Sequence, residues 1–98
     1  MSFQDAFALA DNPEFQQRVT IALVKSAVAV MAEGSSAPNH QLRGTYASKV
    51  LASPEVEGMN MALGVTTNAA ITEQSSDSDI EFTINTLFDA YAGVGVNP

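Results

Sequence analysis

The sequence of 98 residues has no cysteine and few charged side chains. Without cysteine, disulfide bonds and thiolate metal sites are excluded. Charged residues make up 15% of the chain, whereas a soluble domain usually carries about a quarter. Ala, Ser, Thr, Asn and Gln take their place, and these side chains pack against a protein partner as well as they suit water. The composition therefore favours a small domain that associates with other proteins.

Positive charge is scarce and confined to the middle of the sequence. All four bases lie between residues 18 and 53, where Glu33 is the single acid, while residues 54–98 carry seven acids and no base. Four bases are too few for a phosphate-binding stripe, which argues against specific nucleic-acid binding. A subunit polarised in this way can place its acidic end against the basic middle of the next copy.

The side chains predicted to meet between copies are Arg18, Arg43 and Lys49 on one side and Asp77, Asp79 and Glu81 on the other. The alternative is that these acids are only a solvated surface.

The length predicts one helical domain over residues 1–98, with a modest core. The longest apolar run, residues 18–33, is interrupted by Thr20 and Lys25 and falls short of the roughly 20 apolar residues that a membrane span needs. We therefore expect a buried helix in a protein without membrane contact. The first residues have no basic region and carry Asp5 and Asp11, which is unlike a signal peptide.

Capping signals predict an all-α fold, a small bundle of about four main helices plus a short N-terminal helix. Asn12-Pro13-Glu14 and Ser53-Pro54-Glu55 each combine a capping side chain, a proline suited to the first turn and an acid at the positive end of the helix. Ser2 is the expected cap of the first helix, and Gly34 the left-handed cap of the central one. The expected helices cover residues 1–12, 13–32, 38–52 and 54–70, and a fifth begins at residue 78.

The last helix has a rival interpretation. Ser78 and Glu81 match a capping box, and Gly93 supplies a stop, which together favour a helix followed by an extended tail over residues 93–98. However, Ile80, Phe82 and Ile84 alternate, as in a strand. The later helical spacing favours the helix.

Apolar spacing predicts which side of each helix is buried. The central helix has two stripes, and so is expected to be buried on most sides: Phe15, Val19, Ala22, Leu23, Ser26 and Val30, then Ile21, Val24, Val28 and Met31. The next helix buries Leu42, Tyr46, Lys49 and Val50, and turns outward His40, Gln41 and Arg43. The fourth buries Val56, Met59, Leu63 and Ala70, flanked by Met61 and Val65. Phe3 and Phe7 are expected on the body of the domain or on a neighbour.

Three glycines lie inside expected helices. Gly44, Gly58 and Gly64 each lower helix stability by about 1 kcal/mol relative to alanine. Gly44 is either a weak point that the helix tolerates or a place where another backbone comes close.

No motif indicates catalysis or a bound cofactor. His40 is the single histidine and has no acid near it in sequence, so we expect an exposed, non-catalytic side chain. The acids of residues 77–81 alternate as at the start of a calcium loop, but Phe82 and Phe88 stand where the loop needs Gly and Glu. Helix capping explains these acids more simply, and weak adventitious cation binding stays open. We expect no enzyme, cofactor or metal site.

Four stretches carry a family resemblance: RVTIALVKSAVAVMAE, NHQLRGTYASKVLASPE, MALGVTTNAAI and DSDIEFTINTLFDAYAG. Together they resemble small helical proteins from the structural genes of tailed bacteriophages, with adaptor-type head-to-tail connectors the nearest. The resemblance implies subunits that assemble side by side into a ring under the portal, around a duct through which DNA passes. It places the protein in the virion, after assembly in the host cytoplasm. The chain departs from this family in its shortness and in lacking a clear long C-terminal arm.

The expected function is therefore that of a non-enzymatic structural subunit, a homo-oligomer that also contacts portal and neck or tail proteins. The predicted contacts with these partners are Phe3, Phe7, Val94 and Val96. Two alternatives stay open. One is a capsid decoration or tail component, and the other is an acidic regulatory module that mimics DNA.

Overall fold

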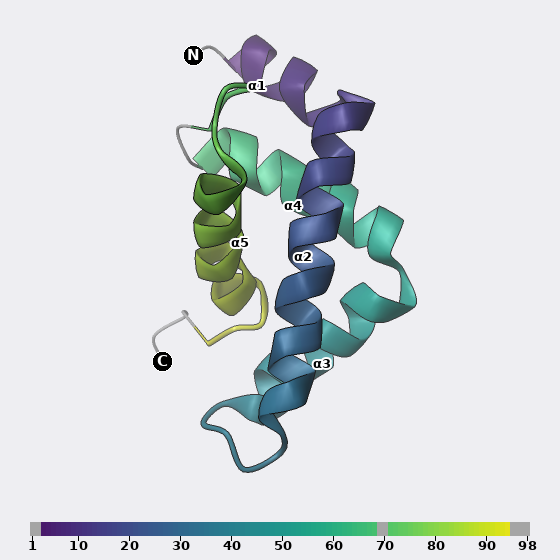
Figure 1. Ribbon diagram of the computed structural model, residues 1–98, viewed down its shortest axis with the longest axis vertical. Coiled ribbons are helices and arrows are strands. Elements are labelled where there is room, and N and C mark those ends of the chain that lie inside the picture. Colours follow the sequence, from purple (N-terminus) through teal and green to yellow (C-terminus); the bar gives the residue numbers. More distant parts are fainter. Residues whose placement is uncertain (1–2, 69–70, 95–98) are drawn as a thin grey trace.

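The computed structural model describes residues 3–68 and 71–94, and within them the regular secondary structure is all helical (Figure 1). The helices are α1 (Phe3–Ala10), α2 (Pro13–Glu33), α3 (His40–Ala52), α4 (Pro54–Asn68) and α5 (Asp77–Tyr91). This confirms the predicted all-α class and the helical interpretation of residues 80–84. The predictions for Ser2, Ala70 and Val96 lie outside the described residues.

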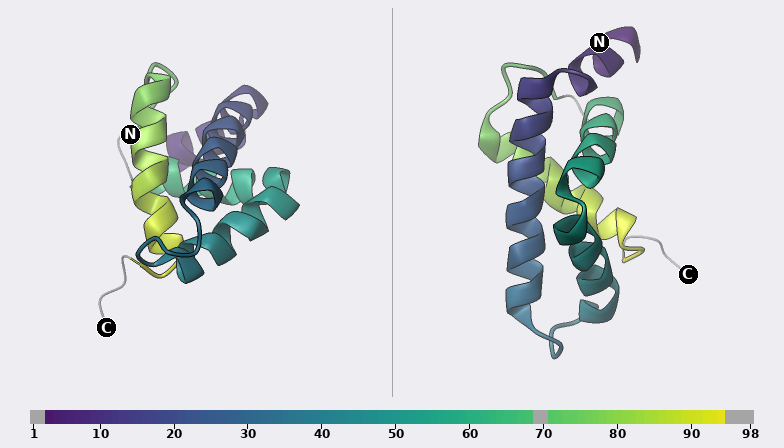
Figure 2. Two further views of the ribbon diagram at one scale, coloured as in Figure 1. Left: turned by 60° about the horizontal axis from the view of Figure 1, so that its bottom comes forward. Right: turned by 90° about the vertical axis from the view of Figure 1, so that its right-hand side faces the viewer.

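The long helix α2 is the axis of the domain. It packs against α3, α4 and α5, and its 21 residues correspond to a rod of roughly 31 Å. Figure 2 shows α3 returning antiparallel to α2. In Figure 1, α4 crosses behind α2, and α5 lies on the other flank of α2. The short α1 lies across one end, against α4. Within the described residues, no helix combines the length and apolarity that a bilayer span requires.

Two of the predicted helix starts are confirmed. The side-chain oxygen of Asn12 accepts hydrogen bonds from the backbone N–H groups of Glu14 (2.9 Å) and Phe15 (3.1 Å), and α4 begins at Pro54. The predicted capping box of α5 is wrong by two residues. Ser76, and not Ser78, is the N-cap, since its hydroxyl accepts from the N–H of Asp79 at 3.1 Å.

Helix ends differ in detail from the expectations. Gly34 ends α2 with a positive φ of 81°, as a glycine stop requires, but its ψ of 170° is outside the left-handed helical range that was predicted. The expected extended tail does not begin at Gly93. Residues 92–94 form a turn in which the N–H of Val94 donates to the carbonyl of Asp89 at 2.9 Å.

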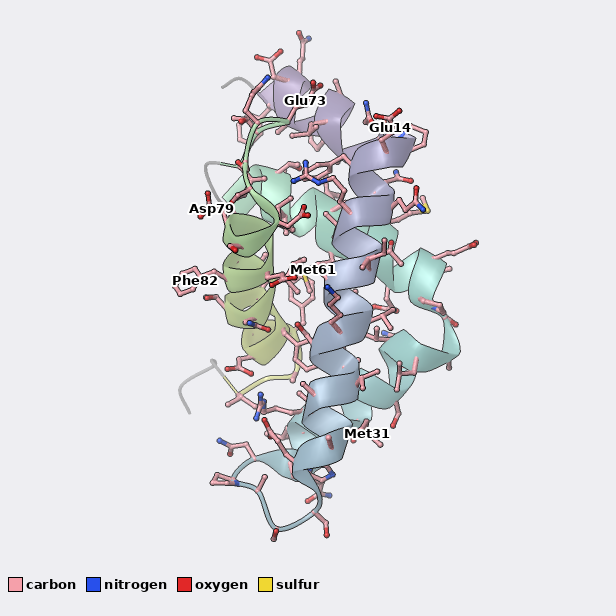
Figure 3. All side chains as sticks on the ribbon, viewed as in Figure 1. Glu14, Met31, Met61, Glu73, Asp79 and Phe82 are labelled. Carbon is pink, nitrogen blue, oxygen red and sulfur yellow. The ribbon has the colours of Figure 1, made fainter. Side chains whose placement is uncertain are left out.

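The core contains the first predicted stripe of α2, with Ala27 buried and Ser26 half-buried. Around it lie Met61 of α4, which Figure 3 places among the helices, and Ile80, Ile84 and Phe88 of α5. Tyr46 packs edge-on against Phe88 with ring centroids 4.7 Å apart, which joins α3 to α5. The core therefore draws on every main helix.

Of the second predicted stripe of α2, only Val24 packs against the core, and it is half-buried; Ile21, Val28 and Met31 are exposed. Ile21 is 51% exposed and Val28 53% exposed, so the prediction that α2 is covered on most sides is wrong. Neighbouring helices cover one side of α2 and leave the opposite side to solvent.

The predicted apolar face of α4 is reversed. Val56, Met59 and Leu63 are exposed, whereas the buried side consists of Glu57, Gly58, Met61, Ala62, Gly64, Val65 and Thr66. The small residues explain the reversal, because they let neighbouring elements come close. A Cβ atom at Gly58 would lie 3.3 Å from the Cα of Thr20 in α2 and would collide with its hydroxyl. Likewise, a Cβ atom at Gly64 would collide with the hydroxyl of Tyr91.

The outer residues of α3 also differ from the expectation. The helix begins at His40, Leu42 is exposed, and Lys49 extends into solvent with 67% of its side chain exposed. Arg43 and His40, expected to face outward, are half-buried. At Gly44 the neighbour is the His40 imidazole one turn earlier, and not another backbone.

Candidate interaction surface

The described residues contain no group of three or more His, Asp or Glu side chains placed to hold a metal ion. The His40 ring lies over Gly44, and its buried Nδ1 makes no hydrogen bond with a described residue. A general base needs a partner that orients it beside a nucleophile, and the structure describes none here. The expectation that the chain is not an enzyme stays a prediction.

Arg18 fastens the segment before α5 to the central helix. Its guanidinium donates to the carboxylate of Asp77 from Nη2 (2.8 Å) and Nε (3.0 Å). Nη2 also donates to the carbonyl of Ser75 at 2.7 Å, and Nη1 to that of Glu73 at 3.4 Å. One side chain thus binds three acceptors on a single segment, and it contacts both the backbone and a carboxylate.

Arg43 makes a second bridge, at the other end of α2. Its Nη1 lies 2.8 Å from a carboxylate oxygen of Glu33, and its Nε lies 3.1 Å from one of Asp89. The Arg43 side chain is 24% exposed, and its guanidinium links the ends of α2 and α5 to α3. Nearby, the hydroxyl of Ser26 donates to the side-chain oxygen of Asn85 at 2.7 Å, so α2 and α5 share a polar edge.

The two lysines have partners as well. Lys25 lies 3.7 Å from Glu81 of α5, and Lys49 lies 3.6 Å from Glu57 of α4. Glu57 is buried, so Lys49 neutralises the one buried carboxylate of the described chain. All four bases of the sequence therefore have a carboxylate partner within their own chain.

These pairs bear on the residues predicted to meet between copies. Arg18 is joined to Asp77 of its own chain, and Glu81 is used by Lys25. The predicted contact between copies stays a prediction, but its bases are already occupied. The carboxylates that make no ion pair with any described residue are Asp11, Glu14, Glu55, Glu73 and Asp79. The unpaired charge of the described surface is thus negative.

Large apolar side chains are exposed on α2 and α4. We call the set formed by Ile21, Val28, Met31, Val56, Met59 and Leu63 the outer surface. Spacing alone misassigned it as core, and the clue that could have corrected this is the concentration of Gly and Ala on the other side of α4. Ile21 of α2 and Met59 of α4 line one groove, so exposed apolar side chains of the two helices come together there, and the outer surface is a candidate for protein contact.

Other exposed aromatics lie away from the outer surface. Phe82 of α5 is 75% exposed and points away from the helices in Figure 3. Phe3 is 74% exposed and stacks on the half-exposed Phe7 with ring centroids 6.4 Å apart. The expectation that this pair packs on the body of its own domain is wrong, and contact with a neighbour stays a prediction. Val94 is half-buried in the turn after α5.

A groove runs between α2 and α4 beside the outer surface. It has a volume of about 390 Å³ and is lined by Pro13, Gln16, Gln17, Thr20, Ile21, Glu55 and Met59. Gln16 is held in place, because its Nε2 donates to the carbonyl of Ala10 at 2.8 Å. The lining includes one acid and no base. Thr20, one of the lining residues, also packs closely on Gly58 of α4.

Tyr46 carries a buried hydroxyl that makes no hydrogen bond with a described residue. Burial, followed by the negative charge of Glu57, raises the pKa of the Tyr46 phenol well above its usual range. Burial also raises the pKa of Tyr91, whose ring centroid lies 6.0 Å from that of Tyr46. Both phenols therefore stay protonated near neutral pH.

No family model, curated protein or solved structure matches this chain. The surface itself and the resemblance to phage connectors therefore carry the functional proposal.

Proposed function

We propose that the protein is a non-enzymatic structural subunit of a tailed-phage virion that assembles with copies of itself into a head-to-tail connector ring. The observation that supports this most is the exposure of large apolar side chains. Twelve of them are exposed among the described residues, on all five helices. Burial of such side chains in an assembly would stabilise a small domain whose own core is limited.

A closed ring requires two different contact surfaces on each subunit, because one surface of each subunit binds the other surface of its neighbour. The chain offers such a pair. The outer surface lies on α2 and α4, and Phe82 projects from α5 on the other flank of α2 (Figure 3). The stacked Phe3 and Phe7, and Val94 beyond α5, are placed near the two ends of the chain, where connector subunits contact portal and neck proteins.

Apolar contact, and not ion pairing, would drive this assembly. The bases predicted to attract a second copy are each paired within the chain, and the chain carries a net charge of -7. Copies that carry this charge repel one another, and salt screens the repulsion. The lack of unpaired bases also suits a duct that must let DNA pass without holding it.

Solution mass and imaging test this proposal. Purified protein should form a discrete closed oligomer, alone or on a portal ring, and negative-stain images should show rings. Particles decorating a capsid shell in many copies would favour the decoration role instead. A protein that stays at the mass of one chain at all concentrations, and forms no ring with portal, would contradict both.

A further inference from the structure

We propose that the groove between α2 and α4 binds an amphipathic helix of a partner protein, and that this partner helix carries basic residues beside its apolar face. The inference rests on the proposed function only in that an assembly subunit needs partners, and it specifies the chemistry of one of them.

The groove has the form and lining that suit a helix. Its lining is apolar at Ile21 of α2 and Met59 of α4, each about half exposed. Amphipathic helices bind in apolar grooves between two helices through side chains at spacings of three and four residues. A methionine in such a lining adapts its shape to the side chain it receives. Gln17 and Thr20 add polar groups along the same lining.

Charge defines the partner. Glu55 of α4 lines the groove. On the α2 side Pro13 lines it, and Asp11 and Glu14 lie on either side of Pro13 in the sequence. None of these three carboxylates makes an ion pair with a described residue. The nearest bases along α2 are Arg18 and Lys25, and both are directed to carboxylates of α5. An apolar groove edged by unpaired carboxylates attracts lysine and arginine and disfavours acidic segments.

The same charges argue against a second copy as the occupant of the groove. A copy would have to supply basic residues, and each base of the chain is already within 4 Å of a carboxylate of its own. It would also bring five more unpaired carboxylates toward those at the groove. The groove, with Ile21 and Met59, is therefore reserved for a different protein. Contacts between copies use the rest of the outer surface, which is Val28, Met31, Val56 and Leu63, together with Phe82.

The direct test is binding of a designed peptide probe. The probe is an amphipathic helix of about 18 residues with leucines spaced three and four apart and lysines beside them. A matched probe replaces every lysine with glutamate. Affinity is measured by fluorescence anisotropy at about 50 and 300 mM salt, and the site is mapped by NMR. The lysine probe should bind and should perturb the amides of residues 16–21 and 55–59, whereas the glutamate probe should not bind.

Two double variants locate the site. Ile21→Ser with Met59→Ser should weaken the lysine probe at least about tenfold, because both side chains line the groove. The control, Leu42→Ser with Phe82→Ser, removes two apolar side chains elsewhere that are 49% and 75% exposed, and should leave the affinity unchanged. Glu55→Gln should weaken binding several-fold and reduce its salt dependence. Circular dichroism establishes that each variant is folded.

The inference is overturned if the glutamate probe binds as well as the lysine probe, if both double variants lose binding equally, or if the amide changes lie on α5. It is also overturned if Ile21→Ser with Met59→Ser abolishes self-association of the folded protein, since the groove would then hold a second copy. A wild-type protein that binds the lysine probe but never forms an oligomer would contradict the connector ring and leave the groove proposal intact.

Discussion

The contact between α2 and α4 at Gly58 leads to a sharp prediction, because two opposing effects can be compared there. In Gly58→Ala the new methyl group would collide with the hydroxyl of Thr20 and lie 3.0 Å from its Cβ and 3.3 Å from its Cα. The Cα belongs to the backbone of α2, so no side-chain rotation relieves the contact. The two helices must move apart, and with them the walls of the groove.

The magnitudes decide the sign. Alanine in place of glycine stabilises a helix by about 1 kcal/mol. Overpacking a close contact costs about 1–3 kcal/mol, and the separation of α2 from α4 also loosens the packing of Met61 and Ala62. The contact with Thr20 is so close that the cost belongs at the upper end of this range, about 2–3 kcal/mol, and we expect Gly58→Ala to lower the free energy of unfolding by about 1–2 kcal/mol. For a domain of this size, that corresponds to a fall in Tm of about 5–15 °C.

Gly44→Ala is the matched control. There the new methyl group would lie 3.1 Å from Nε2 of His40, the end of a half-buried side chain at the first residue of α3. The ring can rotate away, so the gain in helix propensity should prevail, and Gly44→Ala should be up to about 1 kcal/mol more stable than wild type.

Urea unfolding followed by circular dichroism measures both variants. In the Gly58→Ala background, Thr20→Ala should recover part of the lost stability, since it removes the hydroxyl that collides. If Gly58→Ala were as stable as wild type, or if both glycine variants shifted in the same direction, the close packing of α2 on α4 would be refuted.

Arg18→Ala should lower the free energy of unfolding by about 1–2 kcal/mol, and Asp77→Asn should lower it by less, because only Arg18→Ala also loses the hydrogen bonds to backbone carbonyls. Equal losses for the two variants in urea unfolding would contradict this. The raised pKa of Tyr46 means that the folded state holds its proton more tightly than the unfolded state, so stability should be full below about pH 10 and fall above it, by at most about 1.4 kcal/mol per pH unit. In urea unfolding at several pH values, Tyr46→Phe should lessen this fall without loss at pH 7, and an unchanged alkaline fall would refute the assignment. Raising salt should preserve or strengthen self-association in sedimentation experiments, whereas ion pairing between copies would be weakened by it.

Helix class and boundaries could be predicted from local signals. Asn12 and Pro13, and then Pro54, specify helix starts through chemistry that acts within a few residues, and these starts are confirmed. The N-cap of α5 was misplaced, since Ser76 and Ser78 both precede acids at suitable spacing and the sequence does not decide which is used.

Burial could be predicted only where it followed hydrophobicity. The buried face of α4 was predicted on the wrong side. Gly58 lets Thr20 of α2 pack against α4, Gly64 does the same for Tyr91 of α5, and this fit depends on three-dimensional shape. Apolar spacing alone pointed to Val56, Met59 and Leu63, which the structure leaves exposed. The groove and the outer surface could therefore not be foreseen.

The pairing of charges depends equally on the fold. Arg18 and Asp77 are 59 residues apart in sequence, and packing of α5 on α2 places them 2.8 Å apart. The uneven distribution of charge along the sequence suggested attraction between copies, but folding already satisfies each base within one chain. The charged side chains that stay unpaired are acidic. This remaining negative charge would attract a basic partner and repel a second copy.

If exposed apolar surface makes this chain an assembly subunit, as we propose, the protein should self-associate in solution, and its mass there shows whether it does. Light scattering after gel filtration, from micromolar to near-millimolar protein and at low and high salt, measures that mass. We predict a discrete oligomer, a whole-number multiple of the 10.3 kDa chain, which persists or grows more stable as salt rises. A mass of one chain under every condition, or an oligomer that dissociates as salt is added, would contradict the account.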